Sequence, residues 1–162
     1  MAVGREVTLL HATDELDEVA RLAHSRGWVM TWKADTLTLR VSTAAHNGDR
    51  YLVQFELADY KELPPIIDFV DVPTDEVGVR RACPRADDSF FQDSGVICAP
   101  FSRRAYKSFD ARGPHADWNM AAWMMSRDNG TNWANFSRLG DMVSQIDLRL
   151  RDPNRYRGRI QQ

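Results

Sequence analysis

The sequence predicts a single α+β domain in which an N-terminal helix precedes a four-stranded antiparallel meander and a C-terminal helix packs on the sheet. Three observations indicate this class: apolar residues at helical spacing near both ends, alternating apolar and polar residues between positions 36 and 57, and a proline-rich middle without a long periodic segment. A chain of 162 residues suits one domain with its own core. We expect that domain to be residues 1–162, with its core at about 13–156.

The first element is an amphipathic helix predicted over residues 13–26. Thr13 suits the N-cap position, and Asp14, Glu15, Asp17 and Glu18 follow where the positive end of a helix dipole favours acidic side chains. Apolar residues recur at helical spacing as far as Ala23, and Gly27 ends the pattern.

Strands are expected near residues 28–32, 36–44 and 50–57, where β-branched and aromatic residues accumulate. Asn47-Gly48 lies between the last two, and such a pair supplies the two positive-φ residues of a tight hairpin turn. Pro64 and Pro65 cannot belong to a central strand because proline has no backbone N–H to donate. Residues 66–70 are predicted as the fourth strand.

Residues 71–132 hold both cysteines and no long periodic segment, so they are predicted as a cysteine-bearing loop region. A helix then follows from Leu139 to Leu150, with apolar residues at positions i, i+3, i+4, i+7 and i+11. Pro153 ends it. We expect the arginines at 149, 151, 155, 157 and 159 to form a solvated basic segment, with docking to an acidic partner as the alternative.

The composition excludes several classes of protein. Lys plus Arg number 21 against 23 for Asp plus Glu, which argues against a nucleic-acid binder. No apolar run approaches the roughly 18 residues of a membrane span and no signal peptide is recognisable, so a cytoplasmic protein without a membrane partner is expected. Two cysteines without a CxxC pair suggest no metal site, and no cofactor is expected.

Three sequence blocks, in a fixed order along the chain, carry a family resemblance. Gly48 to Phe69 (GDRYLVQFELADYKELPPIIDF) reads as a strand, an aromatic-proline turn and a strand. Ser94 to Cys98 (SGVIC) looks like a Gly-x-Ile-Cys motif around a thioester cysteine, and Trp133 to Asn154 reads as a Trp followed by a helix ending in Asp-Pro-Asn. Together these blocks resemble the ubiquitin-conjugating enzyme family over roughly residues 13–156.

The chain departs from the family in three ways. Cys83-Pro84-Arg85 stands nearest to the family's His-Pro-Asn, whose Asn steadies the oxyanion, so that role is unassigned. The segment between Cys98 and Trp133 is a long insertion, and the first helix is acidic where the family's is commonly basic. These features resemble the divergent bacterial branch, found beside ubiquitin-like modifiers or in antiphage operons with cyclic-nucleotide synthases.

The resemblance implies a carrier transferase in which Cys98 holds the C-terminal glycine carboxyl of a partner as a thioester and passes it to an amine. The implied partners are a ubiquitin-like modifier or a nucleotide cyclase tail, with or without an activating enzyme, in bacterial antiphage defence. Two alternatives stay open: a non-catalytic relative that only binds such a tail, and a Cys-His hydrolase of such linkages using Cys98 and His115.

Cys98 is the candidate nucleophile because a thioester is reactive toward amines yet survives in water. Arg103 and Arg104 are expected to lower the pKa of its thiol. The alternative is a buried structural thiol, which the apolar neighbours in Val96-Ile97-Cys98-Ala99 also fit.

His115, Asp117 and Asn119 are candidates to assist Cys98, since an imidazole or carboxylate can accept the proton of an amine and an amide can donate to an oxyanion. For Asp117, capping of a helix in the apolar run 118–125 is the favoured alternative, and that run itself suits a core segment better than a partner-binding one. Cys83 is a candidate redox partner: a disulfide to Cys98 would close a loop of about 15 residues and switch the nucleophile off, with a packed thiol as the alternative.

Overall fold

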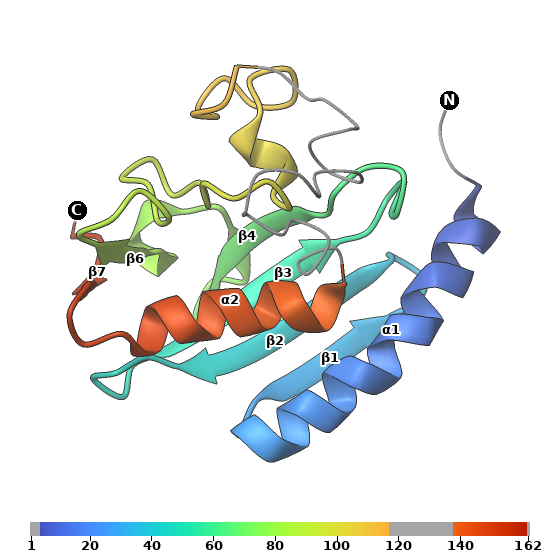
Figure 1. The fold of residues 1–162 in the computed structure, drawn as a ribbon, viewed down its shortest axis with the longest axis horizontal. Coiled ribbons are helices and arrows are strands. Elements are labelled where there is room, and N and C mark those ends of the chain that lie inside the picture. Colours follow the sequence, from blue (N-terminus) through green and yellow to red (C-terminus); the bar gives the residue numbers. More distant parts are fainter. Residues whose placement is uncertain (1–3, 117–137, 162) are drawn as a thin grey trace, which may run out of the picture.

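The computed structural model describes residues 4–116 and 138–161. Its elements are α1 (Arg5–Arg26), β1 (Val29–Lys33), β2 (Thr38–Ala44), β3 (Arg50–Glu56), β4 (Ile66–Asp71), β5 (Glu76–Val77), the short 3-10 helix η1 (Arg80–Ala82), β6 (Pro84–Ala86), a second 3-10 helix η2 (Arg103–Ala105), α2 (Leu139–Arg151) and β7 (Tyr156–Arg159). The predicted α+β class, with a helix at each end of an antiparallel meander, is confirmed (Figure 1).

The main sheet has five strands in the order β1-β2-β3-β4-β5, all antiparallel, and not the four that were predicted. The added strand, β5, is only two residues long and pairs Val77 with Val70, so it leaves no periodic signal in the sequence. A separate sheet pairs β6 with β7 and was also not predicted.

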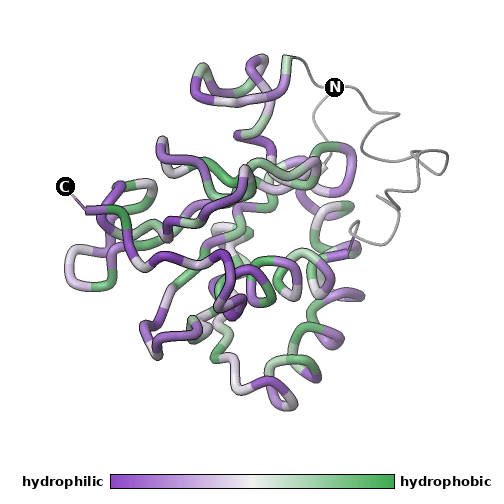
Figure 2. Tube along the Cα trace, turned by 60° about the vertical axis from the view of Figure 1, so that its left-hand side comes forward, coloured by the Kyte–Doolittle hydropathy of each residue, from purple (hydrophilic) through white to green (hydrophobic). Residues whose placement is uncertain are grey.

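Every second residue of β2 and β3 is buried, which sets one face of the sheet against α2. The strand register places Leu39, Phe55 and Ile67 in one row across this face, and Val41, Val53 and Phe69 in the next. The α2 helix lies across β2 and β3 (Figure 1), and the hydroxyl of Thr43 donates to the buried carboxylate of Asp147. Figure 2 shows how short hydrophobic and hydrophilic stretches follow one another along the chain.

The α1 helix begins at Arg5, eight residues before the predicted start. Thr13 is not its N-cap: it lies inside the helix, where its hydroxyl donates to the carbonyl of Leu9 at 2.7 Å. This hydrogen bond within the helix makes threonine compatible with a helix interior. The buried face of α1 begins at Thr8, five residues before Thr13, which is consistent with the earlier start of the helix. The predicted end is correct, because Gly27 closes the helix with φ of 72°.

The predicted hairpin between β2 and β3 is present, but its turn is longer than a two-residue type I′ turn. Gly48 has φ of 88°, whereas Asn47 is not among the residues with positive φ. The Ala45 N–H donates to the carbonyl of Asp49 at 2.8 Å, and the Gly48 N–H donates back to Ala45 at 3.0 Å. One left-handed residue is therefore enough to reverse the chain here.

The prediction of a solvated arginine segment is correct only in part: the side chains of Arg151, Arg155 and Arg157 are exposed, but the segment is folded and its arginines are paired. Arg149 and Arg155 pair with the carboxylate of Asp88, Arg151 with Asp147, and Arg157 with Asp87. Arg159 lies over the ring of Tyr51, 4.2 Å from its centroid. The segment is part of the fold because β7 pairs with β6, which brings Arg155 and Arg157 to Asp88 and Asp87 of the loop region.

The predicted helix at Leu139–Leu150 is confirmed as α2. Two of the predicted site residues, Asp117 and Asn119, and the apolar run at 118–125 lie outside the described residues. Among the helices that the structure does describe, none combines the length and apolar character that crossing a bilayer requires.

Candidate active site

A small hairpin at residues 90–98 carries Cys98. Phe91 and Ile97 form an antiparallel bridge, and the Cys98 N–H donates to the carbonyl of Phe90 at 2.7 Å. Gly95 lies in the turn with φ of 91°, a conformation that glycine adopts without strain. The ring of Phe91 packs edge-on against Phe69 of β4, with centroids 5.9 Å apart. The hairpin is thus fixed to the main sheet.

Cys98 stands at the end of this hairpin and is partly exposed, although its neighbours Ile97 and Ala99 are buried. The backbone hydrogen bond to Phe90 is the last one of the hairpin, so it fixes the position of the Cys98 backbone and of its thiol. The alternative of a fully enclosed structural thiol does not match this exposure.

His115 lies beside Cys98, with 3.5 Å between its Nε2 atom and the cysteine Sγ. Its backbone is held against the segment that follows η2: the His115 N–H donates to Ala105 at 2.8 Å, and its carbonyl accepts from Lys107 at 3.0 Å. Gly113 allows this close approach, because a Cβ there would lie 2.7 Å from the carbonyl oxygen of Ala105. Two of the predicted site residues are therefore in contact.

Burial raises the pKa of the Cys98 thiol, so the expectation that arginines lower it is wrong. The guanidinium of Arg103 donates instead to the carbonyls of Pro64 and Ala58, and Arg104 is paired with carboxylates. Cys98 is consequently a neutral thiol near pH 7, and a nucleophilic role requires a base. His115 is the base in contact with it.

A network of four charged residues joins the sheet to the segments on either side of this pair. Arg104 donates to Asp68 of β4 and to Asp110, which also accepts from Arg112 at 2.8 Å. Arg112 reaches the carbonyl of Ser94, in the turn of the Cys98 hairpin, at 3.3 Å. The arginines hold the pKa of Asp110 well below its ordinary value, so its carboxylate stays charged.

Cys83 is buried beneath the hairpin turn, and burial raises the pKa of its thiol to about 11. Its Sγ atom lies 3.4 Å from the carbonyl oxygen of Val79, and a Cβ added at Gly95 would lie 3.1 Å from it. Both cysteines are free thiols in the structure. A reversible disulfide between Cys83 and Cys98 stays a prediction.

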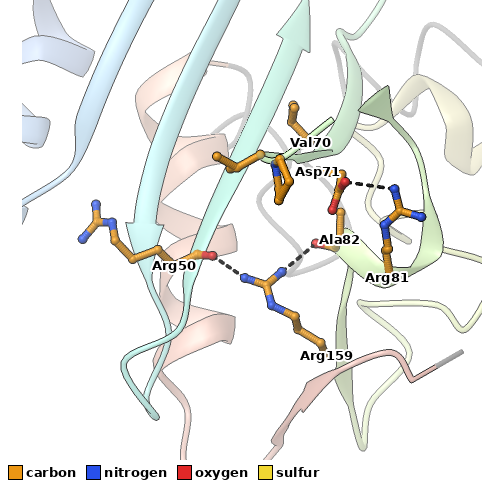
Figure 3. A pocket seen from close by; sticks show the side chains of 8 residues that line it. Arg50, Val70, Asp71, Arg81, Ala82 and Arg159 are labelled. Atoms are coloured by element: carbon orange, nitrogen blue, oxygen red, sulfur yellow. Dashed lines mark hydrogen bonds and ion pairs between the residues drawn. The ribbon is translucent and has the colours of Figure 1, made fainter. Parts of the chain in front are cut away.

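A pocket of about 460 Å³ lies apart from this pair, and neither Cys98 nor His115 lines it (Figure 3). Its guanidinium groups are already bound by the protein: Arg81 pairs with Asp71 at 3.0 Å, and Arg159 donates to the carbonyls of Arg50 and Ala82. We therefore place the candidate site at Cys98 and not in this pocket.

Comparisons with protein-family models, with curated proteins and with solved structures found no match to this chain. The candidate site thus rests on the geometry described above. Within residues 4–116 and 138–161, no three histidine, cysteine or carboxylate side chains gather into a group that could hold a metal ion.

Sequence reasoning missed the charge network and the hairpin at 90–98. The hairpin has a signal that could have been used, since two buried aromatic residues and Val96-Ile97 flank a four-residue stretch containing Gly95. Asp68 carries no local signal, because its role in the network depends on Arg104, which the fold brings to it.

Proposed function

We propose that the protein is a thioester carrier of the ubiquitin-conjugating type, in which Cys98 accepts an acyl group and passes it to an amine. The observation that carries the proposal is the contact at 3.5 Å between a partly exposed thiol and an imidazole. The Ser94 to Cys98 block and the order of helix, meander and helix support it. The proposed cargo is the C-terminal glycine of a ubiquitin-like modifier or of a nucleotide cyclase, within bacterial antiphage defence.

In the loading step, the Cys98 sulfur attacks the carbonyl carbon of an activated C-terminal glycine. His115 accepts the thiol proton as the new C–S bond forms, and the bond from the acyl carbon to the previous carrier breaks. His115 then gives this proton to the departing group. The raised pKa of Cys98 makes such a base necessary, because the thiol does not ionise alone near pH 7.

In the transfer step, an amine attacks the thioester carbon, a C–N bond forms and the C–S bond breaks. The amine loses one proton, and the Cys98 thiolate gains one to return to the thiol. His115 lies where it can accept the first and supply the second. The same residue therefore serves both half-reactions.

A synthetic peptide ending in glycine, supplied as its thiophenyl ester, tests the loading step without an activating enzyme. We expect Cys98 to gain the mass of the peptide acyl group, and the adduct to be released by hydroxylamine. Cys98→Ala should abolish the adduct, whereas Cys83→Ala, the matched control at the buried cysteine, should retain it. Acylation that persists in Cys98→Ala would contradict the proposal.

Hydrolysis is a second candidate function, favoured by the same Cys98–His115 contact, since thiol hydrolases use such a pair. The two functions differ in what attacks the thioester. If the loaded protein is mixed with free lysine, a transferase yields the peptide amide, whereas a hydrolase yields the free acid at the same rate with or without lysine. A non-catalytic binding module would form no adduct in either case.

A further inference from the structure

Tyr106 contacts both halves of the candidate site. It is 4% exposed, and its hydroxyl donates to the carbonyl of Pro100 at 2.8 Å, two residues after Cys98. Its ring lies beside the imidazole of His115, with centroids 5.5 Å apart and the planes inclined by 36°. It also pairs with His115 through a parallel backbone bridge.

The geometry points to Tyr106 as a positioning residue that holds Cys98 and His115 at reacting distance. Its ring fixes the imidazole from one side, and its hydroxyl fixes the backbone that leaves the cysteine. This inference rests on the proposed function in one respect: it takes Cys98 and His115 to react as a pair.

The need for such a residue follows from the local structure. Cys98 lies at the end of a short hairpin, and His115 lies beyond η2 in a segment without regular structure, so neither side chain belongs to a long element. Two loops can drift relative to each other, and a displacement of about 1 Å can reduce a catalysed rate by as much as a hundred-fold. Tyr106 reduces this freedom because one rigid ring contacts both loops.

The electrostatics of Tyr106 agree with this placement. Burial raises the pKa of its hydroxyl to about 12, and the nearby Cys98, which is ionised at such high pH, contributes to the increase. The hydroxyl therefore stays protonated throughout the physiological range and keeps donating to Pro100.

Alkylation of Cys98 by iodoacetamide, followed by mass spectrometry of its peptide across a pH series, tests the inference. With His115 in place, Cys98 should react near neutral pH, whereas His115→Ala should react only at high pH, where the thiol ionises alone. The quantity compared is the alkylation rate of Cys98 at pH 7 divided by its alkylation rate at high pH. We expect Tyr106→Phe to lower this ratio by roughly ten-fold. Tyr106→Leu, which also removes the ring, should lower it further.

Tyr156→Phe is the matched control. The Tyr156 hydroxyl is also in a 2.8 Å hydrogen bond, but with the hydroxyl of Tyr51 and not with the backbone near Cys98, and Tyr156 is 7% exposed. Both variants lose one buried hydroxyl, so a purely structural effect would lower both melting temperatures and leave both alkylation profiles unchanged. Rates are compared at a temperature at which every variant is folded.

The outcomes separate the two proposals. A wild-type profile in Tyr106→Phe and Tyr106→Leu, with a changed profile in His115→Ala, overturns the positioning role alone. A wild-type profile in His115→Ala overturns the reacting pair and the positioning role together. Alkylation needs no acyl donor, so a protein that shows the expected profiles but never loads the peptide thioester contradicts only the transferase.

Discussion

Arg104 and Asp68 face each other through two parallel hydrogen bonds, from Nε to Oδ1 at 2.8 Å and from Nη2 to Oδ2 at 2.9 Å. The Asp68 side chain is 7% exposed, whereas that of Arg104 is 30% exposed. Asp68 belongs to β4 and Arg104 to η2, between Cys98 and His115 in the chain. A bidentate charge pair therefore ties the candidate site to the sheet.

We expect Arg104→Met to destabilise the protein, because it leaves the buried Asp68 carboxylate without this partner. Removing one member of a fully buried pair costs about 3–5 kcal/mol, and the partial exposure of Arg104 reduces our expectation to roughly 2–3 kcal/mol. Urea unfolding measures this change. Asp68→Asn alone and the double variant complete the cycle: the double variant should lose less stability than the sum of the two single losses, and a loss equal to that sum would show that the pair is not coupled.

The charged state of Asp110 predicts a pH dependence of stability. Its pKa is lowered in the folded protein by hydrogen bonds from Arg112, so its contribution is present above the ordinary aspartate pKa of 3.8 and is lost as pH falls toward the folded value. Asp110→Asn should therefore be less stable than the wild type at pH 7, and the difference should shrink below about pH 4. Asp93→Asn, at an exposed aspartate, is the control, and a difference for Asp110→Asn that does not vary with pH would refute the assignment.

Gly95 is expected to tolerate alanine less well than Gly27 does. Both have positive φ, of 91° and 72°, so each substitution meets a backbone cost of about 1 kcal/mol. Only at Gly95 does the new Cβ also meet the Cys83 sulfur, at 3.1 Å, whereas nothing lies within 4 Å at Gly27. Thermal unfolding should show the larger loss for Gly95→Ala, and Cys83→Ala should relieve the excess. Equal losses of stability at the two glycines would mean that contact with the Cys83 sulfur does not destabilise Gly95→Ala.

Glu15 is predicted to stabilise the start of α2. It is 1% exposed, and its Oε1 atom accepts the Leu139 N–H at 3.2 Å, which satisfies a donor that the helix itself leaves unpaired. Glu15→Ala should cost about 1–2 kcal/mol, and Glu15→Gln less, because the amide oxygen still accepts. Asp17→Ala on the exposed side of α1 should change the stability by less than about 0.5 kcal/mol.

The strands β2 and β3 and the helix α2 were predictable because their burial follows a local period. Apolar residues alternate with polar ones in β2 and β3, and they recur at helical spacing from Leu139 to Leu150. Both patterns indicate which side of the element faces the core. The start of α1 was missed because Thr13 and the acidic residues after it satisfy the capping pattern, and only the buried face at Thr8 and Ala12 shows that the helix starts earlier. β7 was missed because the sequence Tyr-Arg-Gly-Arg has no apolar alternation.

At the candidate site, the sequence pointed to Cys98 and His115 but not to what connects them. Their contact depends on the backbone pairing of His115 with the residues around Tyr106, which no local pattern encodes. Arg103 and Arg104 were expected to lower the pKa of the Cys98 thiol only because they lie close to it in the sequence. In the fold they turn to partners in β4 and the loop before it, Asp68 and Pro64.

The pairing of β6 with β7 sets an order in which the molecule can assemble. The carbonyl of Cys83 accepts the Ile160 N–H at 2.9 Å, and the carbonyl of Arg155 accepts the Asp87 N–H at 2.9 Å. Residues just after α2 are therefore hydrogen-bonded to the segment that lies beneath the Cys98 hairpin. Contacts between segments so distant in the chain form late, because the intervening loop must close first. The Ile160 and Asp87 amides should therefore exchange their hydrogens as one unit, earlier than those of the central strands, and that opening would be the moment at which the buried Cys83 thiol meets solvent.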